Sequence, residues 1–334
     1  MPSQHGSLTR FLLIIFAAMA CLAQVSCTRS HGPVELKLAV NVPFRFIAYG
    51  DTRFHDPKDT AAANAAVRQA LVQAIASAKP AFVSFGGDIV YNGYDLDDWK
   101  TWDSETRVWR ENKIHIYPVL GNHDLHGDPK VALANYFQRF PELKNSRYYS
   151  VRIANTLMLV LDSSVDETSG PQGQWLTQKL DVIPSDVEFV FIVLHHPPYT
   201  SSSDEKKYGG GHSARSPEQM LAKLLEDRQQ HTRARFVVFS GHVHNYERHE
   251  HAGVTYFVTG GGGAHAYPIE RAPGDPFQSK AVNYHYLLVE VDRGKMIVTM
   301  NRLDLTTGKE IWTQPDSVAI SVNNAASAKA GSGN

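Results

Sequence analysis

Short runs of apolar residues alternate with helical patterns along most of the chain. Apolar runs bounded by glycine, proline or polar residues predict buried strands at residues 44–49, 82–85, 114–120, 156–161, 189–194 and 236–239. Apolar residues at helical spacing predict helices between them, at residues 60–78, 99–109, 172–180 and 217–228. Further strands are expected at residues 254–259, 284–291 and 296–301. Because strands alternate with helices and no repeat is visible, we expect a single α/β domain.

Several of the predicted strands end in the same way, with a polar residue that can bind a metal. Asp51, Asp88, Asn122 and His242 each follow a glycine at such an end, and His195 follows another strand directly. Glycine lets the backbone turn sharply and approach a ligand closely. In open α/β sheets, ligand sites lie outside the carboxyl ends of the strands. We therefore expect these side chains to share one site.

The pair His242 and His244 extends this set, since residues two apart in an extended segment point the same way. A histidine pair alone is weak support for a site, because many such residues lie in cores or on surfaces. Here the pair completes a set of seven nitrogen and oxygen donors: Asp51, Asp88, Tyr91, Asn122, His195, His242 and His244. Such donors suit iron, zinc or manganese, and seven of them fit two ions with a shared ligand.

Composition narrows the classes of function. The chain has 334 residues, is 43% hydrophobic and carries a net charge of −1, which is enough apolar material for a large core. The chain has neither a strong net charge nor a polybasic run, so its composition does not favour nucleic acid or anionic lipid as a partner. Cysteine is absent after position 27, which excludes thiolate ligands and internal disulfides from the folded part.

The N-terminus reads as a targeting segment. Residues 11–20 are apolar, follow Arg10 and are too few to span a bilayer, so residues 1–27 are predicted to be a signal peptide. The protein is then exported, and is periplasmic, secreted or lipid-anchored. Cys21 and Cys27 are either ordinary leader residues or include the lipidated first residue of a lipoprotein, and residues 17–20 before Cys21 resemble a lipobox. Such an anchor is the one membrane contact that we expect.

The rest of the chain divides into four parts by pattern. Residues 28–43 read as a lead-in, residues 44–305 as the domain, residues 306–322 as a C-terminal extension, and residues 323–334 as a disordered tail rich in alanine, serine and glycine.

Taken in order, the motifs resemble those of the calcineurin-like metallophosphoesterases, over residues 44–301. They are Gly50-Asp51, Gly87-Asp88-Ile-Val-Tyr91, Gly121-Asn-His-Asp124, His195-x-Pro197 and Gly241-His-Val-His-Asn-Tyr-Glu-Arg248. The resemblance is closer to the purple acid phosphatases, because Tyr91 stands three residues after Asp88, Trp99 and Trp102 follow, and the last motif ends in Tyr-Glu-Arg. It implies a two-sheet β-sandwich flanked by helices.

The resemblance also implies the roles of the donors. Asp51, Tyr91 and His244 would bind a first metal, iron(III), and Asp88 would bridge to the second. Zinc, manganese or iron(II) would occupy the second position, held by Asn122, His195 and His242. In the implied reaction, a hydroxide bridging the metals attacks a phosphate monoester of a small molecule. His123 would contact the phosphate and protonate the leaving group, and Asp124 would orient its ring.

Two further residues have more than one interpretation. Arg53 stands where the wider family has a histidine ligand, and guanidinium cannot bind a metal. It is either a clamp for phosphate or a solvated surface residue, and His55 is an alternative ligand. His212, after a run of glycines, either contacts phosphate or belongs to a flexible loop.

Three supporting features are expected near the site. Glu247 and Arg248 would form an ion pair with each other, Tyr199 would line the pocket or pack in a turn, and residues 260–263 would form a tight glycine loop.

The sequence leaves the class of substrate open. A phosphodiesterase or nucleotidase can be built on the same scaffold, because a fold does not determine a substrate. A non-catalytic surface module that binds phosphate or envelope ligands is the alternative from another class, although the complete donor set speaks against it. Neither the oligomeric state nor the pH optimum follows from the sequence.

Overall fold

The computed structural model describes residues 33–203 and 212–322. The expectations for the signal peptide, for Cys21 and Cys27, and for the tail at residues 323–334 lie outside the described residues.

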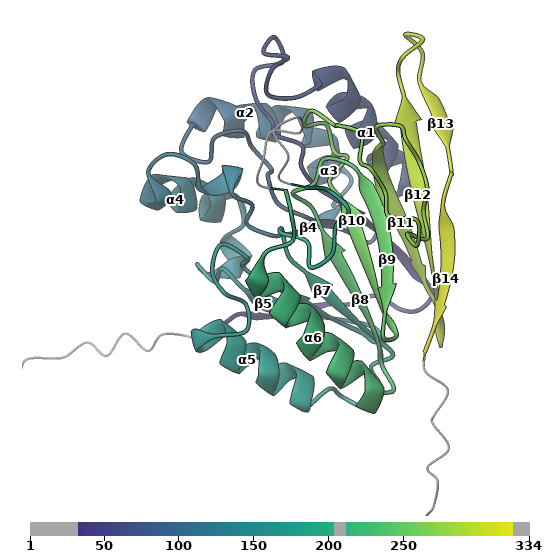
Figure 1. Ribbon diagram of the computed structural model, residues 1–334. Coiled ribbons are helices and arrows are strands. Elements are labelled where there is room, and N and C mark those ends of the chain that lie inside the picture. The colour runs from purple at the N-terminus through teal and green to yellow at the C-terminus, as the bar shows by residue number, and fades with distance from the viewer. Residues whose placement is uncertain (1–32, 204–211, 323–334) are drawn as a thin grey trace, which may run out of the picture. The chain divides into compact units, whose positions relative to one another are not determined.

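Two sheets of seven strands each form the centre of the fold (Figure 1). The first, sheet A, has the strand order β1-β5-β6-β7-β8-β10-β9. Its strands are Glu35–Leu38 (β1), Tyr149–Ile153 (β5), Thr156–Val160 (β6), Phe189–Val193 (β7), Arg235–Ser240 (β8), Tyr246–His251 (β9) and Val254–Thr259 (β10). Strands β6, β7, β8 and β10 run parallel to one another.

The second, sheet B, has the order β13-β12-β11-β2-β3-β4, and β14 pairs with β12. Its strands are Phe44–Tyr49 (β2), Phe82–Phe85 (β3), His115–Pro118 (β4), Tyr284–Val291 (β11), Lys295–Asp304 (β12), Ile311–Thr313 (β13) and Ser317–Ser321 (β14). Strands β2, β3 and β4 are parallel, so their carboxyl ends lie at one edge.

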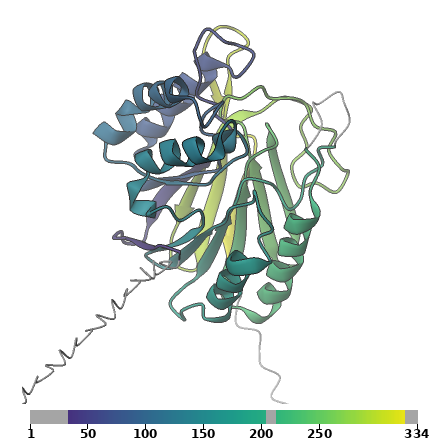
Figure 2. The same ribbon diagram turned by 90° about the vertical axis from the view of Figure 1, so that its left-hand side faces the viewer.

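Helices cover the outer faces of both sheets. They are Ala65–Ala78 (α1), Leu96–Glu105 (α2), Arg107–Glu111 (α3), Pro129–Arg139 (α4), Gly170–Asp181 (α5) and Ser216–His231 (α6), with short 3₁₀ turns at His123–Leu125 and Pro141–Leu143. The helices form two groups, and Figure 2 shows α1 to α4 on one side of the sheets and α5 and α6 on the other. None of the helices in the described residues is both long and apolar enough to cross a membrane. The expected two-sheet α/β architecture is confirmed.

The side chains of β6 point alternately into two apolar clusters, one on each face of sheet A. Leu157 and Leu159 belong to the apolar cluster under α5 and α6, whereas Met158 and Val160 belong to the cluster between the sheets. Successive side chains of a strand point to opposite faces, so a strand that is apolar throughout is buried on both sides. This is why the predicted strands are apolar runs and do not alternate with polar residues.

The ends of the domain differ from the prediction. The segment interpreted as a lead-in contains β1, which pairs with β5, and the C-terminal extension contains β14, which pairs with β12. Both are short edge strands whose burial alternates only weakly, so their pairing depends on a partner far away in sequence. The first helix starts at Ala65 and not at residue 60, because the side chain of Asn64 accepts a hydrogen bond from Val67 N and caps it.

Phe46 of β2 links the two sheets. Its ring stacks on Phe82 of sheet B at 4.6 Å and lies 5.2 Å from Phe191 and 5.9 Å from Phe239 of sheet A. The side chain is fully buried, so its removal leaves a cavity between the sheets.

We therefore expect Phe46→Ala to lower the free energy of unfolding by about 3–5 kcal/mol, measured by urea denaturation. Val182→Ala is the control, since Val182 is 70% exposed and its truncation should change stability by less than about 0.5 kcal/mol. Equal effects of the two changes would show that the contact between the sheets does not depend on Phe46.

Candidate metal centre

The expected donors come together at the carboxyl ends of the strands of both sheets. Asp51 follows β2, Asp88 follows β3, Asn122 follows β4, His195 follows β7, and His242 follows β8. One ligand atom from each of Asp51, Asp88 and His195 lies within 4.8 Å of the other two. Segments that are up to 191 residues apart in sequence therefore share one point in space.

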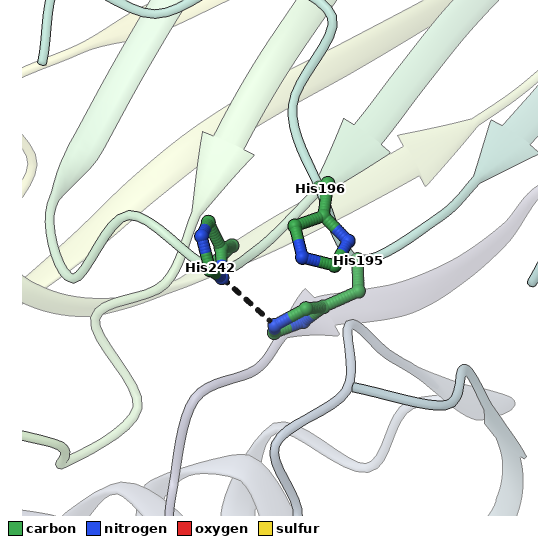
Figure 3. A group of neighbouring side chains, drawn as sticks. All are labelled: His195, His196 and His242. Carbon is green, nitrogen blue, oxygen red and sulfur yellow. Dashed lines mark hydrogen bonds between the residues drawn. The ribbon is translucent and has the colours of Figure 1, made fainter. Parts of the chain in front are cut away.

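The second group of donors is tightly packed. Nε2 of His195 lies 3.0 Å from Oδ1 of Asn122 and 3.4 Å from Oδ1 of Asp88. Nδ1 of His242 lies 3.1 Å from the same Asn122 oxygen and 3.3 Å from Nε2 of His195. Figure 3 shows the rings of His195 and His242 facing each other at this point.

A backbone carbonyl determines which nitrogen of His195 faces the site. Nδ1 lies 2.9 Å from the carbonyl oxygen of Gly86, which can only accept, so Nδ1 carries the proton. Nε2 is then unprotonated and faces the oxygens of Asn122 and Asp88. Three lone pairs that face one another in a buried site need a cation between them. This group therefore fits a metal ion.

The first group shows the same arrangement. Nδ1 of His244 donates to the carbonyl of His265 at 2.8 Å, which leaves Nε2 unprotonated. That nitrogen is buried, has no hydrogen-bond partner among the described residues, and lies 3.7 Å from Oδ1 of Asp51. An unpaired buried acceptor beside a carboxylate fits a second cation.

Charge in the site supports this interpretation. Burial, and then the neighbouring Asp88, raise the pKa of Asp51 well above its ordinary value. Burial acts in the same direction on Asp88, but His195, His123 and Arg53 outweigh it and hold the pKa of Asp88 below its ordinary value. Two buried carboxylates side by side cannot both ionise unless positive charge lies next to them.

Close approach of the loops requires glycine at two positions. A Cβ atom on Gly121 would lie 2.2 Å from the nitrogen of Asp88, and one on Gly241 would lie 2.3 Å from Oδ2 of Asp51. The site also holds four residues other than glycine in the left-handed region: Asp51 (φ 58°), Arg53 (φ 46°), Asp88 (φ 49°) and His242 (φ 67°). Such a conformation costs about 1–2 kcal/mol for each residue, so the fold imposes strain here.

Tyr91 lies between two other histidines. Its ring packs between His55, with ring centroids 5.1 Å apart, and His123, at 5.3 Å. His55 itself is bound to Asp98 through Nδ1 and to Asp59 through Nε2, so both of its nitrogens are engaged away from the metal groups. The structure does not support His55 as a substitute ligand, and Tyr91 as a ligand stays a prediction.

Arg53 points into the site and not into solvent. One nitrogen of its guanidinium lies 3.4 Å from Oδ2 of Asp88, and 18% of its side chain is exposed. Its backbone is held by the buried Arg68, which donates to the carbonyl of Arg53 and forms a two-pronged ion pair with Glu105. The interpretation as a solvated surface residue is therefore wrong.

His123 and Asp124 occupy the expected place, but one expected contact is wrong. Nδ1 of His123 donates to the carbonyl of Tyr91 at 2.7 Å, and this bond orients the ring. Asp124 cannot do so, because its oxygens accept hydrogen bonds from backbone nitrogens of the two adjacent loops, those of Ile89, Val90 and Gly121. Asp124 holds the loop after Asp88 in position.

Three further aromatic rings lie beside the histidines of the site. His212 has its ring centroid 5.2 Å from His242, 5.9 Å from His244 and 5.0 Å from Tyr267. Tyr267 also accepts a hydrogen bond from the nitrogen of His244 at 3.2 Å. The ring of His126 lies 4.1 Å from that of His123. The sequence patterns do not single out Tyr267 or His126. His126 stands within the Gly-Asn-His motif segment, whereas nothing local marks Tyr267.

The supporting residues also depart from expectation. Glu247 and Arg248 do not pair with each other, because neighbouring residues of a strand point to opposite faces. Glu247 accepts hydrogen bonds from Thr200 and Ser201 and so holds the loop after His195, whereas Arg248 pairs with Asp316.

The structure also shows the roles of Tyr199 and of the glycine loop at residues 260–263. Tyr199 packs on His251 with ring centroids 3.9 Å apart and donates to Glu226, so it is a packed residue of the fold. In the glycine loop, the nitrogen of Gly262 donates to the carbonyl of Gly50, which ties the loop after β10 to the loop after β2.

Comparison with known proteins agrees with this geometry. The sequence profile of the calcineurin-like phosphoesterase family matches residues 44–246, which include every expected metal donor. The chain is 28% identical over 193 residues to purple acid phosphatase 1 of Ipomoea batatas, which covers 52% of this chain and 38% of that protein. It is 29% identical over 205 residues to phosphoenolpyruvate phosphatase of Allium cepa, which covers 56% of this chain and 40% of that protein.

A solved structure has a similar fold. A purple acid phosphatase from yellow lupin seeds superimposes with a TM-score of 0.63 at 15% identity, over 84% of this chain and 54% of that one. The chain spans about two fifths of the length of the two curated relatives, the phosphatases of Ipomoea batatas and Allium cepa. Since the family profile covers more than half of the chain, the protein belongs to the calcineurin-like phosphoesterase family and, within it, is similar to the purple acid phosphatases.

Proposed function

We propose that this protein is an exported phosphatase that uses two metal ions to hydrolyse phosphate monoesters of small molecules. The observation that carries the proposal is the buried cluster in which unprotonated imidazole nitrogens face the carboxylates of Asp51 and Asp88. Such a cluster is stable only when cations occupy it. The names of both curated relatives support a phosphatase, and phosphoenolpyruvate is itself a monoester.

The donors divide into two sets that share one carboxylate. The first would hold iron(III) through Asp51, Asp88, Tyr91 and His244, and the second would hold zinc, manganese or iron(II) through Asp88, Asn122, His195 and His242. Two such ions supply an activated water as nucleophile and neutralise charge on the phosphoryl group. The hydrogen bonds of His195 to Gly86 and of His244 to His265 keep the binding nitrogens free of protons.

Arg53 would bind the phosphate. Its guanidinium offers a planar array of donors that matches phosphate oxygens, and its place beside Asp88 puts it at the edge of the metal groups. The support by Arg68 and Glu105 keeps its backbone in place. His212 and Tyr267, whose rings pack against each other beside His242 and His244, would contact the rest of the substrate.

His123 would serve the leaving group. Because Nδ1 donates to the carbonyl of Tyr91, Nε2 is the nitrogen that must gain the proton that is transferred. Burial lowers the pKa of His123 to about 4, so the free enzyme holds this ring neutral at neutral pH. Acid conditions, or the negative charge of a bound phosphate, would place a proton on Nε2 and allow the ring to act as an acid.

Export is part of the proposal and is supported by the sequence alone. The apolar residues 11–20 after Arg10 are typical of a signal peptide. Mass spectrometry of the mature N-terminus would test it and would also decide whether Cys21 or Cys27 carries lipid.

The metal content tests the proposal most directly. We expect the purified protein to contain two metal ions and to be pink or purple, because Tyr91 would form a charge-transfer complex with iron(III). Visible spectroscopy and elemental analysis measure both. A colourless protein with zinc or manganese would rule out the purple subclass but leave a metallophosphoesterase. A protein without metal that stays inactive after iron, zinc or manganese is added would point to a non-catalytic binding module.

Substrate preference distinguishes the enzymatic alternatives. We expect the rate with an aryl phosphate monoester to exceed the rate with a bis-aryl diester and with a cyclic nucleotide, all assayed side by side. A faster rate with the diester would replace the phosphatase by a phosphodiesterase on the same scaffold.

Asp88→Asn tests the shared ligand. The change keeps the shape of the side chain and suits the left-handed backbone at this position, but it removes the charge. We expect activity to fall by more than about a hundredfold and the metal content to fall with it, since losing even an outer partner of a ligand costs about 10–100-fold. Asp186→Asn, at a side chain that is 75% exposed, is the control. Near-normal turnover of Asp88→Asn would contradict the two-metal site.

Arg53→Ala tests the clamp. Loss of a charge-assisted hydrogen bond should raise KM for an aryl phosphate at least about tenfold, with a smaller change in kcat. Arg152→Ala is the matched control, because Arg152 pairs with Asp186 at the opposite ends of the strands. If KM is unchanged in both variants, Arg53 does not contact the substrate.

A further inference from the structure

His196 stands directly after the metal donor His195 and has no assigned role. Its ring lies 4.3 Å from that of His242 and 5.0 Å from that of His195, measured between centroids. One ligand atom from each of the three rings lies within 4.8 Å of the others, and Figure 3 shows them converging. The residue is mostly buried, with 7% of its surface accessible.

Ser163 determines which nitrogen of His196 carries the proton. The Oγ atom of Ser163 lies 3.1 Å from the backbone nitrogen of His196, which can only donate, and 2.8 Å from Nδ1. Ser163 is fully buried, and its hydroxyl has no other hydrogen-bond acceptor among the described residues, so its proton is satisfied only by Nδ1. The Ser163 hydroxyl therefore donates to Nδ1, and the ring proton of His196 is on Nε2.

Ser163 is itself held firmly. The guanidinium of Arg215 donates to the carbonyl of Ser163 at 2.6 Å and is bound through two nitrogens to Glu218. Glu218 is fully buried, so this ion pair orders the serine from behind. A chain of contacts that reaches α6 thus orients a ring at the metal centre.

This tautomer is opposite to that of three other histidines of the site. His123, His195 and His244 each donate Nδ1–H to a backbone carbonyl, which leaves Nε2 without a proton; the acceptors are the carbonyls of Tyr91, Gly86 and His265. His196 alone among these has Nδ1 as acceptor and Nε2–H as donor. Nε2 of His196 has no hydrogen-bond partner among the described residues. A donor at this place is unsuited to a metal and suited to an oxyanion.

We propose that His196 donates its Nε2–H to an oxygen of the phosphate group bound at the site, and that Ser163 is the positioning residue that makes it a donor. The inference rests on the proposed function, because it deepens how the same site recognises phosphate. His196 and Arg53 then donate to the phosphate from opposite sheets, one from the loop after β7 and the other from the loop after β2.

Binding of inorganic phosphate to the purified, metal-containing protein tests this, measured by isothermal titration. We expect His196→Ala to weaken phosphate binding about ten- to a hundredfold, the cost of one hydrogen bond to a charged group. His196→Gln, whose amide nitrogen reaches a similar position, should stay within about threefold of wild type. Ser163→Ala should weaken binding by an intermediate factor, because it permits the other tautomer. Metal content should be unchanged in all three.

Ser84→Ala is the matched control, since Ser84 is a buried serine on β3 whose hydroxyl has no partner among the described residues. Unchanged phosphate affinity in His196→Ala and Ser163→Ala would overturn the inference. Loss of metal from His196→Gln and His196→Ala alike would also overturn it, since the ring would then be a metal ligand. If the wild type contains metal and is active but the variants bind phosphate as tightly as it does, only this inference fails. If the wild type has no metal or no activity, the proposed function itself fails.

Discussion

Asp51 and Asp88 are two carboxylates buried within a few ångströms of each other, and the architecture of the site depends on this pair. In water their repulsion would be weak, but burial removes the screening, so the pair is stable only with positive charge beside it. The unprotonated nitrogens of His195 and His244 meet the carboxylates at the positions where cations fit. Arg53 adds a fixed positive charge, because guanidinium stays protonated.

The backbone conformation allows these side chains to lie so close together. Glycine at positions 121 and 241 permits contacts that any Cβ atom would block, and the left-handed conformations of Asp51 and Asp88 are strained. Strain of this kind persists only where the surroundings impose it. The two apolar sheets provide that support, with Phe46 packed against both of them and hydrogen bonds such as that from Gly262 to Gly50 tying their loops together.

Protons in the site are distributed by the partners of the rings. Backbone carbonyls leave Nε2 of His195 and of His244 without a proton, whereas the hydroxyl of Ser163 leaves the proton of His196 on Nε2. Adjacent histidines, His195 and His196, thus have opposite chemistry because their partners differ, one being an acceptor and the other a donor. A site that binds cations and an anion together, as we propose for this one, would use both kinds of ring.

The sequence by itself determined the central strands and the polar residues at their ends, because apolar runs and the Gly-Asp, Gly-Asn-His and His-x-His patterns act locally. It did not reveal that β1 and β14 join the sheets, or that Asp124 holds a loop, since those contacts link distant segments. Only the tertiary structure decided the direction of Arg53, the approach of Tyr267 and the tautomer of His196. The physical reason is that each depends on a partner brought near by folding, which no local pattern encodes.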